Sequence, residues 1–117
     1  MRRAEQAIQA AVCEHLRRRA QTNVYWFHPA NGGMRSKVEA RIFVGLGVTP
    51  GTPDIFAIHQ GRTYALELKA PQGRLSAVQK AAHEALRAAG AEVAVAYGLD
   101  AAIRQLEDWQ LLRGVML

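Results

Sequence analysis

Residues 51–69 read Gly-Thr-Pro-Asp-Ile-Phe-Ala-Ile-His-Gln-Gly-Arg-Thr-Tyr-Ala-Leu-Glu-Leu-Lys, and this stretch decides how the chain folds. Two runs rich in apolar residues flank a turn-forming cluster, a pattern that predicts an antiparallel β-hairpin. The connection is either a two-residue loop or a symmetric four-residue loop, both centred on Gln60-Gly61. Both loops give the same register, in which Glu67 faces Asp54.

This register places two carboxylates side by side. Directly opposed residues of an antiparallel pair have Cβ atoms roughly 5 Å apart, and like charges at that distance are destabilising. A shared divalent cation, which prefers hard oxygen ligands, would relieve the repulsion. Lys69 lies two residues after Glu67 and therefore shares its face of the strand, while Tyr64, Leu66 and Leu68 point to the core. The spacing alone also arises by chance, so the strand context carries the interpretation.

The motifs around the hairpin resemble those of a nuclease family. Pro53-Asp54 followed by Glu67-Leu68-Lys69 resembles the PD-(D/E)xK signature. Taken with Asn31-Gly32-Gly33, with the Gly- and Pro-rich segment 47–54 and with segment 67–79, the chain resembles the virus-type replication-repair nuclease (VRR-NUC) domain. The resemblance covers nearly the whole chain in the right order.

The resemblance implies a metal-dependent active site. It implies that Asp54, Glu67 and the carbonyl group of Leu68 hold Mg²⁺, for which Mn²⁺ can substitute, and that Glu5 adds a direct or water-mediated contact. Lys69 would orient the attacking water or stabilise the developing charge. The catalytic residues expected in this way are Asp54, Glu67, Lys69, Glu5 and Gln79.

Hydrophobic periodicity and turn signals predict a single α/β domain over residues 1–117. Helices are expected over 3–19, 36–46, 76–89 and from Asp100 to about 112, and strands over 24–28, 55–58, 63–68 and 92–97. The helix between the last two strands implies a parallel, right-handed crossover. A mixed central sheet flanked by helices matches the restriction-endonuclease-like αβββαβ core, with an extra helix after the first strand.

Glu5 and Gln79 each have two interpretations. Glu5 lies on the apolar stripe of the first helix, where an unpaired charge is costly, so it suits a metal ligand; it also suits the positive end of the helix dipole. Gln79 closes a capping box with Ser76, and by the resemblance it lies near the scissile phosphate. We expect these two roles of Gln79 at different moments.

The other helices and the histidines give weaker signals. Residues 24–28 are expected to form a buried strand, and the third helix is expected to turn an apolar face inward. The members of that face are Val78, Ala81, Ala82, Ala85 and Leu86. Gly51 would let a substrate backbone come close. The four histidines show no metal-ligand spacing, so none is placed in the site; His28 lies at the edge of the loop 29–33, from which it could approach the site.

The charge distribution favours nucleic acid as the partner. Residues 1–41 contain 8 Lys or Arg and 3 Asp or Glu, whereas residues 42–117 contain 7 of each kind. All of the net charge of +5 therefore lies in the first third, which suits a polyanion. The candidate DNA contacts are Arg35, Lys37, Arg41 and Arg74; the alternative is an ordinary basic surface that aids solubility.

Partners and location follow from the same features. No apolar run has the length of a membrane span, no signal peptide is visible, and the one cysteine, Cys13, indicates a reducing cytoplasm. Stand-alone proteins that resemble this chain include homodimers that resolve Holliday junctions. We therefore expect a homodimeric junction endonuclease; the alternatives are a flap or branched-DNA repair nuclease and a non-cleaving DNA-binding module.

An apolar C-terminal cluster is the candidate dimer contact. Its members exceed what one short terminal helix usually buries, although they would also serve to cover the sheet. They are Trp109, Leu111, Leu112, Val115, Met116 and Leu117.

Overall fold

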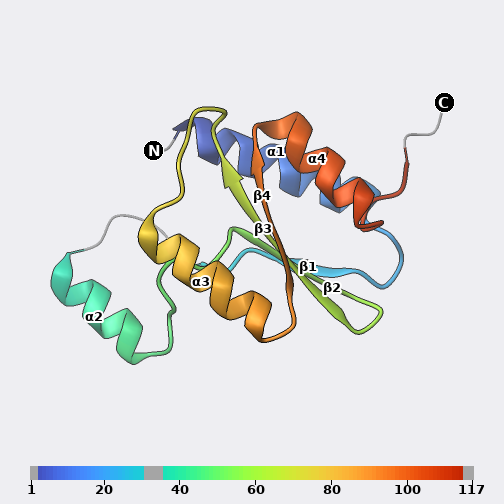
Figure 1. Ribbon diagram of the computed structural model, residues 1–117. Coiled ribbons are helices and arrows are strands. Elements are labelled where there is room, and N and C mark those ends of the chain that lie inside the picture. The colour runs from blue at the N-terminus through green and yellow to red at the C-terminus, as the bar shows by residue number, and fades with distance from the viewer. Residues whose placement is uncertain (1–2, 31–35, 115–117) are drawn as a thin grey trace.

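A four-stranded mixed sheet separates the helices in the computed structural model, which describes residues 3–30 and 36–114 (Figure 1). The elements in chain order are α1 (Arg3–Arg19), β1 (Tyr25–Phe27), α2 (Lys37–Gly45), β2 (Ile55–His59), β3 (Arg62–Lys69), α3 (Ala77–Ala88), β4 (Glu92–Tyr97) and α4 (Leu99–Asp108). The strands lie in the order β1-β2-β3-β4; β3 and β4 are parallel and the other pairs are antiparallel. The predicted α/β class, element order and parallel crossover are confirmed.

The hairpin formed by β2 and β3 has the predicted register. Ile58 pairs with Thr63 and Ile55 pairs with Leu66. Both loop residues have positive φ angles, 51° at Gln60 and 77° at Gly61. Two consecutive positive φ angles are the requirement of a type I′ two-residue turn, whose twist matches the flanking strands. Continued by one residue beyond β2, this register brings Asp54 to Glu67.

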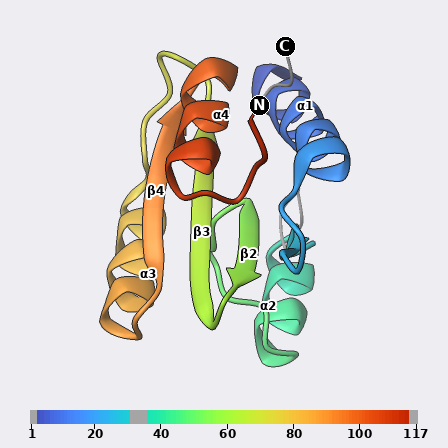
Figure 2. The ribbon, with the colours of Figure 1, turned by 90° about the vertical axis from the view of Figure 1, so that its right-hand side faces the viewer.

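The strand β3 is buried on both faces. Tyr64, Leu66 and Leu68 lie on one face, in the main hydrophobic core with Val12 and Leu16 of α1 and Leu106 of α4. Figure 2 shows α1 and α4 on the opposite side of the sheet from α3. An ion pair of 2.6 Å between Arg19 of α1 and Glu107 of α4 fastens these two helices together.

The helix α3 covers the other face of the sheet, which carries Glu67 and Lys69. Its predicted apolar face is correct for Ala82 and Leu86, which are half-buried, and wrong for Val78, Ala81 and Ala85, which are exposed; His83 is the buried residue of the helix. The stripe that faces the sheet is Gln79, Ala82, His83 and Leu86. Polar contacts to β3 determine the rotation of this helix, and hydrophobicity alone does not reveal them.

Two expectations about the strands and helix ends also need correction. The strand β1 lies at the edge of the sheet, so Tyr25 and Phe27 are exposed and Trp26 alone packs against the core. The helix α4 begins at Leu99 after the N-cap residue Gly98, with Asp100 in its first turn, and it ends at Asp108 and not near residue 112.

The C-terminal apolar cluster covers the protein's own core where the structure describes it. Leu111 and Leu112 are buried, and the ring of Trp109 lies 5.1 Å from that of Tyr64. Leu112 also forms an isolated bridge with Ala20. These three residues are therefore not a free dimer surface, as had been expected; Val115, Met116 and Leu117 lie outside the described residues.

The helix α2 extends to one end of the molecule, away from the sheet (Figures 1 and 2). It begins with a capping box, in which the Ser36 hydroxyl accepts from the Glu39 N–H and the Glu39 carboxylate accepts from the Ser36 N–H. None of its residues is buried, and Val38, Ile42 and Val44 are exposed. Among the described residues, no helix is long and apolar enough to cross a membrane.

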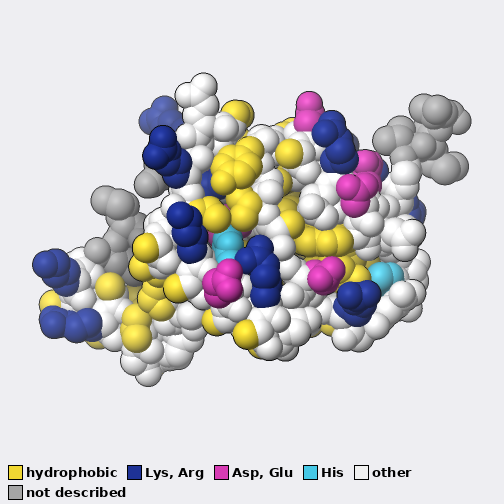
Figure 3. All heavy atoms as spheres, viewed as in Figure 1, with side chains coloured by type: hydrophobic (Ala, Val, Ile, Leu, Met, Phe, Trp, Pro, Cys, Tyr) yellow, Lys and Arg dark blue, Asp and Glu magenta, His cyan; other side chains and the backbone are white. Residues whose placement is uncertain are grey.

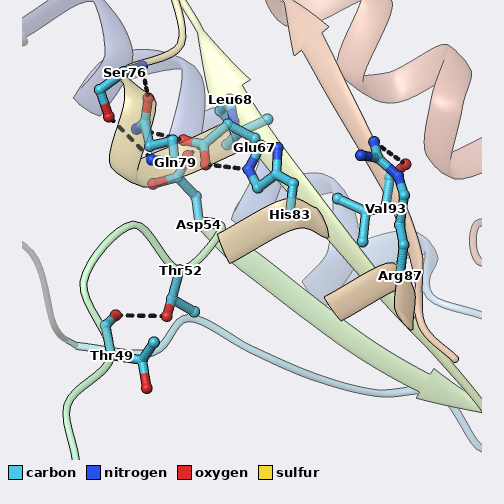
Figure 4. Close-up of polar contacts among 10 residues, drawn as sticks. All are labelled: Thr49, Thr52, Asp54, Glu67, Leu68, Ser76, Gln79, His83, Arg87 and Val93. Atoms are coloured by element: carbon cyan, nitrogen blue, oxygen red, sulfur yellow. Dashed lines mark hydrogen bonds and ion pairs between the residues drawn. The ribbon is translucent and has the colours of Figure 1, made fainter. Parts of the chain in front are cut away.

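The loop that leads into β2 packs closely against α3. Gly51 has a φ of +80°, and a Cβ atom built there would lie 2.5 Å from the carbonyl oxygen of Val78. The start of α3 therefore gives Gly51 a packing role that the sequence did not predict. Thr52 steadies the same loop by donating to the carbonyl of Thr49 at 2.6 Å (Figure 4).

We predict that Gly51→Ala destabilises the fold more than Gly47→Ala does. Both glycines have positive φ, so both substitutions carry backbone strain of roughly 1–2 kcal/mol. Only Gly51 is crowded; a Cβ at Gly47 meets nothing within 4 Å. Overpacking should add about 1–3 kcal/mol, measured by urea unfolding. Equal losses of stability in the two variants would contradict the packing described here.

Candidate active site

Asp54 and Glu67 meet where β2 begins and β3 nears its end (Figure 4). The Asp54 carboxylate accepts a hydrogen bond of 2.8 Å from the backbone N–H of Leu68. The Glu67 side chain lies beneath α3 and only 3% of the residue is exposed. His28 lies at the edge of the site, with its Nδ1 atom 2.6 Å from the backbone carbonyl oxygen of Asp54. The hairpin thus holds two acidic groups together in a place with little water.

The two acidic groups cannot both be charged at low energetic cost. Burial raises the pKa of Glu67 to about 9, helped by a hydrogen bond and charge repulsion from Asp54. The nearby Lys69 acts in the opposite direction, and Glu5 adds a smaller repulsion. In the metal-free protein at neutral pH, Glu67 therefore holds a proton.

Lys69 and Glu5 lie at the outer end of this site. Lys69 shares the face of β3 that carries Glu67, and 8% of the residue is exposed. Glu5 reaches from α1 to the end of β3, where its carboxylate accepts from the Ala70 N–H at 3.4 Å. A Cβ atom at Gly73 would lie 3.3 Å from the same carboxylate, so this loop closes around Glu5.

Gln79 makes the expected capping-box contact and a second contact that the sequence did not predict. Its Oε1 atom accepts from the Ser76 N–H at 2.9 Å and closes the capping box, while its Nε2 atom donates to Glu67 at 3.3 Å. The two ends of the amide therefore link the start of α3 to the acidic pair, and a role of Gln79 near the scissile phosphate stays a prediction.

His83 is the site residue that sequence reasoning missed. Its Nε2 atom lies 3.1 Å from the Oε1 atom of Glu67, and only 2% of the residue is exposed. Burial, followed by the charge of Arg87, lowers the pKa of His83 and favours the neutral ring. The signal was its position four residues after Gln79, which places both side chains on one face of a helix.

The donors at this site suit a hard divalent cation. Asp54 and Glu67 offer carboxylate oxygens, and a cation between them would remove the repulsion that raises the pKa of Glu67. Within residues 3–30 and 36–114, no group of three or more His, Cys, Asp or Glu side chains is arranged to hold a metal ion. The fit therefore rests on the two carboxylates.

The candidate DNA contacts are spread along the chain. Lys37 and Arg41 are exposed on α2, and Arg74 is exposed in the loop between β3 and α3. Arg35 lies outside the described residues. Figure 3 shows Lys and Arg side chains beside hydrophobic ones at the end of the molecule formed by α2.

Comparisons with known proteins extend the likeness to three dimensions. No family model and no curated protein matches the sequence. A solved structure described as "VRR_NUC domain protein" superposes with a TM-score of 0.77 at 24% identity, covering 95% of this chain and 92% of that one. At this identity the likeness shows the fold, and the resemblance predicted from the motifs is confirmed at that level.

We predict that the metal-free Glu67→Gln variant gains thermal stability over the wild type as the pH rises. Between pH 4.5 and about 9 the folded protein holds a proton on Glu67 that the unfolded chain releases, so this group's contribution to stability falls across that window. Glutamine does not titrate and escapes the loss. One kcal/mol shifts the melting temperature of a domain this size by roughly 4 °C, and we expect a larger gap at pH 8.5.

Glu84→Gln on the exposed surface of α3 is the matched control for this experiment. Its melting temperature should differ from that of the wild type by the same small amount at every pH. A Glu67→Gln gap that stays constant from pH 5 to 8.5 would contradict the raised pKa.

Proposed function

We propose that this protein is a metal-dependent, structure-selective DNA endonuclease of the VRR-NUC type that hydrolyses phosphodiester bonds. The observation that carries the proposal is the pairing of the half-buried Asp54 with the buried Glu67, with Lys69 on the same strand face. Such a pair does little for stability, because a carboxylate removed from water must be paired or protonated.

Phosphodiester hydrolysis requires an activated water, an in-line approach and neutralisation of charge at phosphorus. Asp54, Glu67 and the Leu68 carbonyl would hold Mg²⁺, or Mn²⁺ in its place. The bound ion would supply the charge neutralisation and the lowered pKa of water. The Lys69 ammonium group would orient the attacking water or meet the developing negative charge. Gln79 would keep Glu67 in place, and Glu5 would support the end of β3.

A non-cleaving DNA-binding module is the rival of this proposal. A binding module needs cations toward the DNA and gains nothing from buried anions, which repel phosphate. The acidic pair therefore favours the enzyme. The phosphate backbone would be contacted by Lys37, Arg41 and Arg74, with Arg35 as a further candidate from the sequence. The half-buried Cys13 thiol, without a disulfide partner, suits a reducing cytoplasm.

We further propose that the enzyme acts on branched DNA as a homodimer and resolves Holliday junctions. A four-way junction presents two symmetric strands, and a two-fold dimer would present two equivalent sites to them. The helix α2 supports this proposal in place of the C-terminal cluster. Its apolar residues Val38, Ile42 and Val44 are exposed and would supply an apolar contact between two copies.

We predict that Asp54→Ala, Glu67→Ala and Lys69→Ala each reduce cleavage of a four-way junction by at least about 100-fold, the scale of a lost group that stabilises the transition state. The assay uses Mg²⁺ and Mn²⁺, with circular dichroism to check the fold. Asp108→Ala at the exposed end of α4 is the control. Full activity in any of the three variants would show that its residue takes no part in the mechanism. A wild-type protein that shows no metal-dependent cleavage would contradict the proposal that it is an enzyme.

We predict that Glu5→Gln lowers metal-dependent cleavage and that Glu14→Gln does not. Both residues are on α1, but Glu14 is exposed and pairs with Arg17 and Arg18, whereas Glu5 contacts the end of β3. The amide keeps the size of the side chain and removes the charge near Glu67. Equal cleavage rates in the two variants would indicate that Glu5 serves only to stabilise the start of helix α1.

We predict a dimer at micromolar concentration in sedimentation velocity. Ile42→Glu on α2 should yield a monomer that loses paired cuts on a junction, because the charge interrupts the apolar contact. Ile58→Glu introduces the same charge at an exposed apolar position of β2 and should leave the dimer intact. A monomeric wild type that cuts flaps would contradict the junction proposal and favour the repair-type alternative.

A further inference from the structure

The carboxylate of Glu67 is held by two side chains from one helix. His83 reaches its Oε1 atom at 3.1 Å and Gln79 reaches its Oε2 atom at 3.3 Å. The two side chains are one turn apart on α3 and point toward Glu67 together in Figure 4. Each carboxylate oxygen of Glu67 therefore has its own partner on α3.

The direction of the Gln79 hydrogen bond follows from the capping box. The Ser76 N–H can only donate, so the Gln79 atom that it meets is the amide oxygen. The opposite end of that amide is then the NH₂ group, which donates to Glu67. This contact makes the Oε2 atom of Glu67 an acceptor, a role that it keeps whether the carboxyl group is protonated or ionised.

His83 supplies the matching contact on the other oxygen. A carboxylate held at both oxygens cannot rotate about its terminal bond, so its remaining lone pairs keep one direction. Glu67 and His83 are 3% and 2% exposed, and at that burial water is a poor substitute for either donor. An imidazole whose Nε2 atom carries the hydrogen meets this requirement.

We propose that His83 is a positioning residue, which donates from Nε2 to Glu67 and fixes the plane of this carboxylate for cation binding. This inference rests on the proposed function, because it assigns His83 to the site of the acidic pair. His83 would act through Glu67 and would touch neither the DNA nor the reacting atoms. The prediction for Glu67 is that its affinity for a cation depends on a residue 16 positions later in the chain.

Three substitutions separate this role from simple packing. In His83→Gln the amide nitrogen replaces Nε2 at a similar reach, whereas in His83→Asn the shorter amide ends near the position of Nδ1. His83→Leu keeps an apolar volume and removes every donor. The affinity for Mn²⁺ is measured by isothermal titration calorimetry, and kcat and KM are measured on a junction substrate; circular dichroism confirms the fold.

We expect the Asn and Leu variants to bind Mn²⁺ about 10- to 100-fold more weakly, the range found when an outer partner of a metal ligand is lost. The Gln variant should stay within about threefold of the wild type, and the losses should appear in kcat and not in the KM for DNA. The positioning role is wrong if the wild type binds Mn²⁺ and cleaves DNA and all three variants do so equally well. It is also wrong if the Gln variant loses as much Mn²⁺ affinity as the Leu variant. If the wild type binds no Mn²⁺ and cuts no DNA, the proposed function fails together with this inference.

Discussion

The pairing of the half-buried Asp54 carboxylate with the buried Glu67 side chain is the constraint on which the rest of this structure depends. Two like charges at this separation repel, and burial removes the water that would screen them. The protein tolerates the pair by holding a proton there, as the raised pKa of Glu67 indicates. Under the proposed function, a divalent cation between these residues would achieve the same neutralisation.

Three separate elements converge to hold this pair. The type I′ turn at Gln60 and Gly61 sets the register that brings the two acids together, and the Leu68 N–H binds Asp54. The helix α3 binds Glu67 through its first two turns, and its start is fixed by the Ser76 capping box and by close packing on Gly51. The same contacts therefore stabilise the fold and align the site, so we expect substitutions that shift the start of α3 to affect both.

The sequence was sufficient for the hairpin and for the acidic pair, because a period of two and a tight turn leave only one register. It was insufficient wherever tertiary contacts decide which face of a helix is buried. The contacts of Gln79 and His83 with Glu67 determine which face of α3 lies against the sheet. A hydrophobic pattern in the sequence does not reveal these polar contacts. Leu111 and Leu112 close the core after α4, and the apolar residues of α2 remain unburied. Whether these apolar residues are covered depends on the path of the chain beyond the end of each helix. The local sequence carries little information about that path.

The most direct test of the paired-carboxylate site is the number of protons released when Mn²⁺ binds to the metal-free protein at pH 7. Calorimetric titrations in buffers of different ionisation enthalpy give this number. We predict about one proton per ion, since Glu67 with a pKa near 9 is protonated before the ion binds. Binding of Mn²⁺ without proton release, or release that persists unchanged in Glu67→Gln, would contradict a shared proton on the acidic pair.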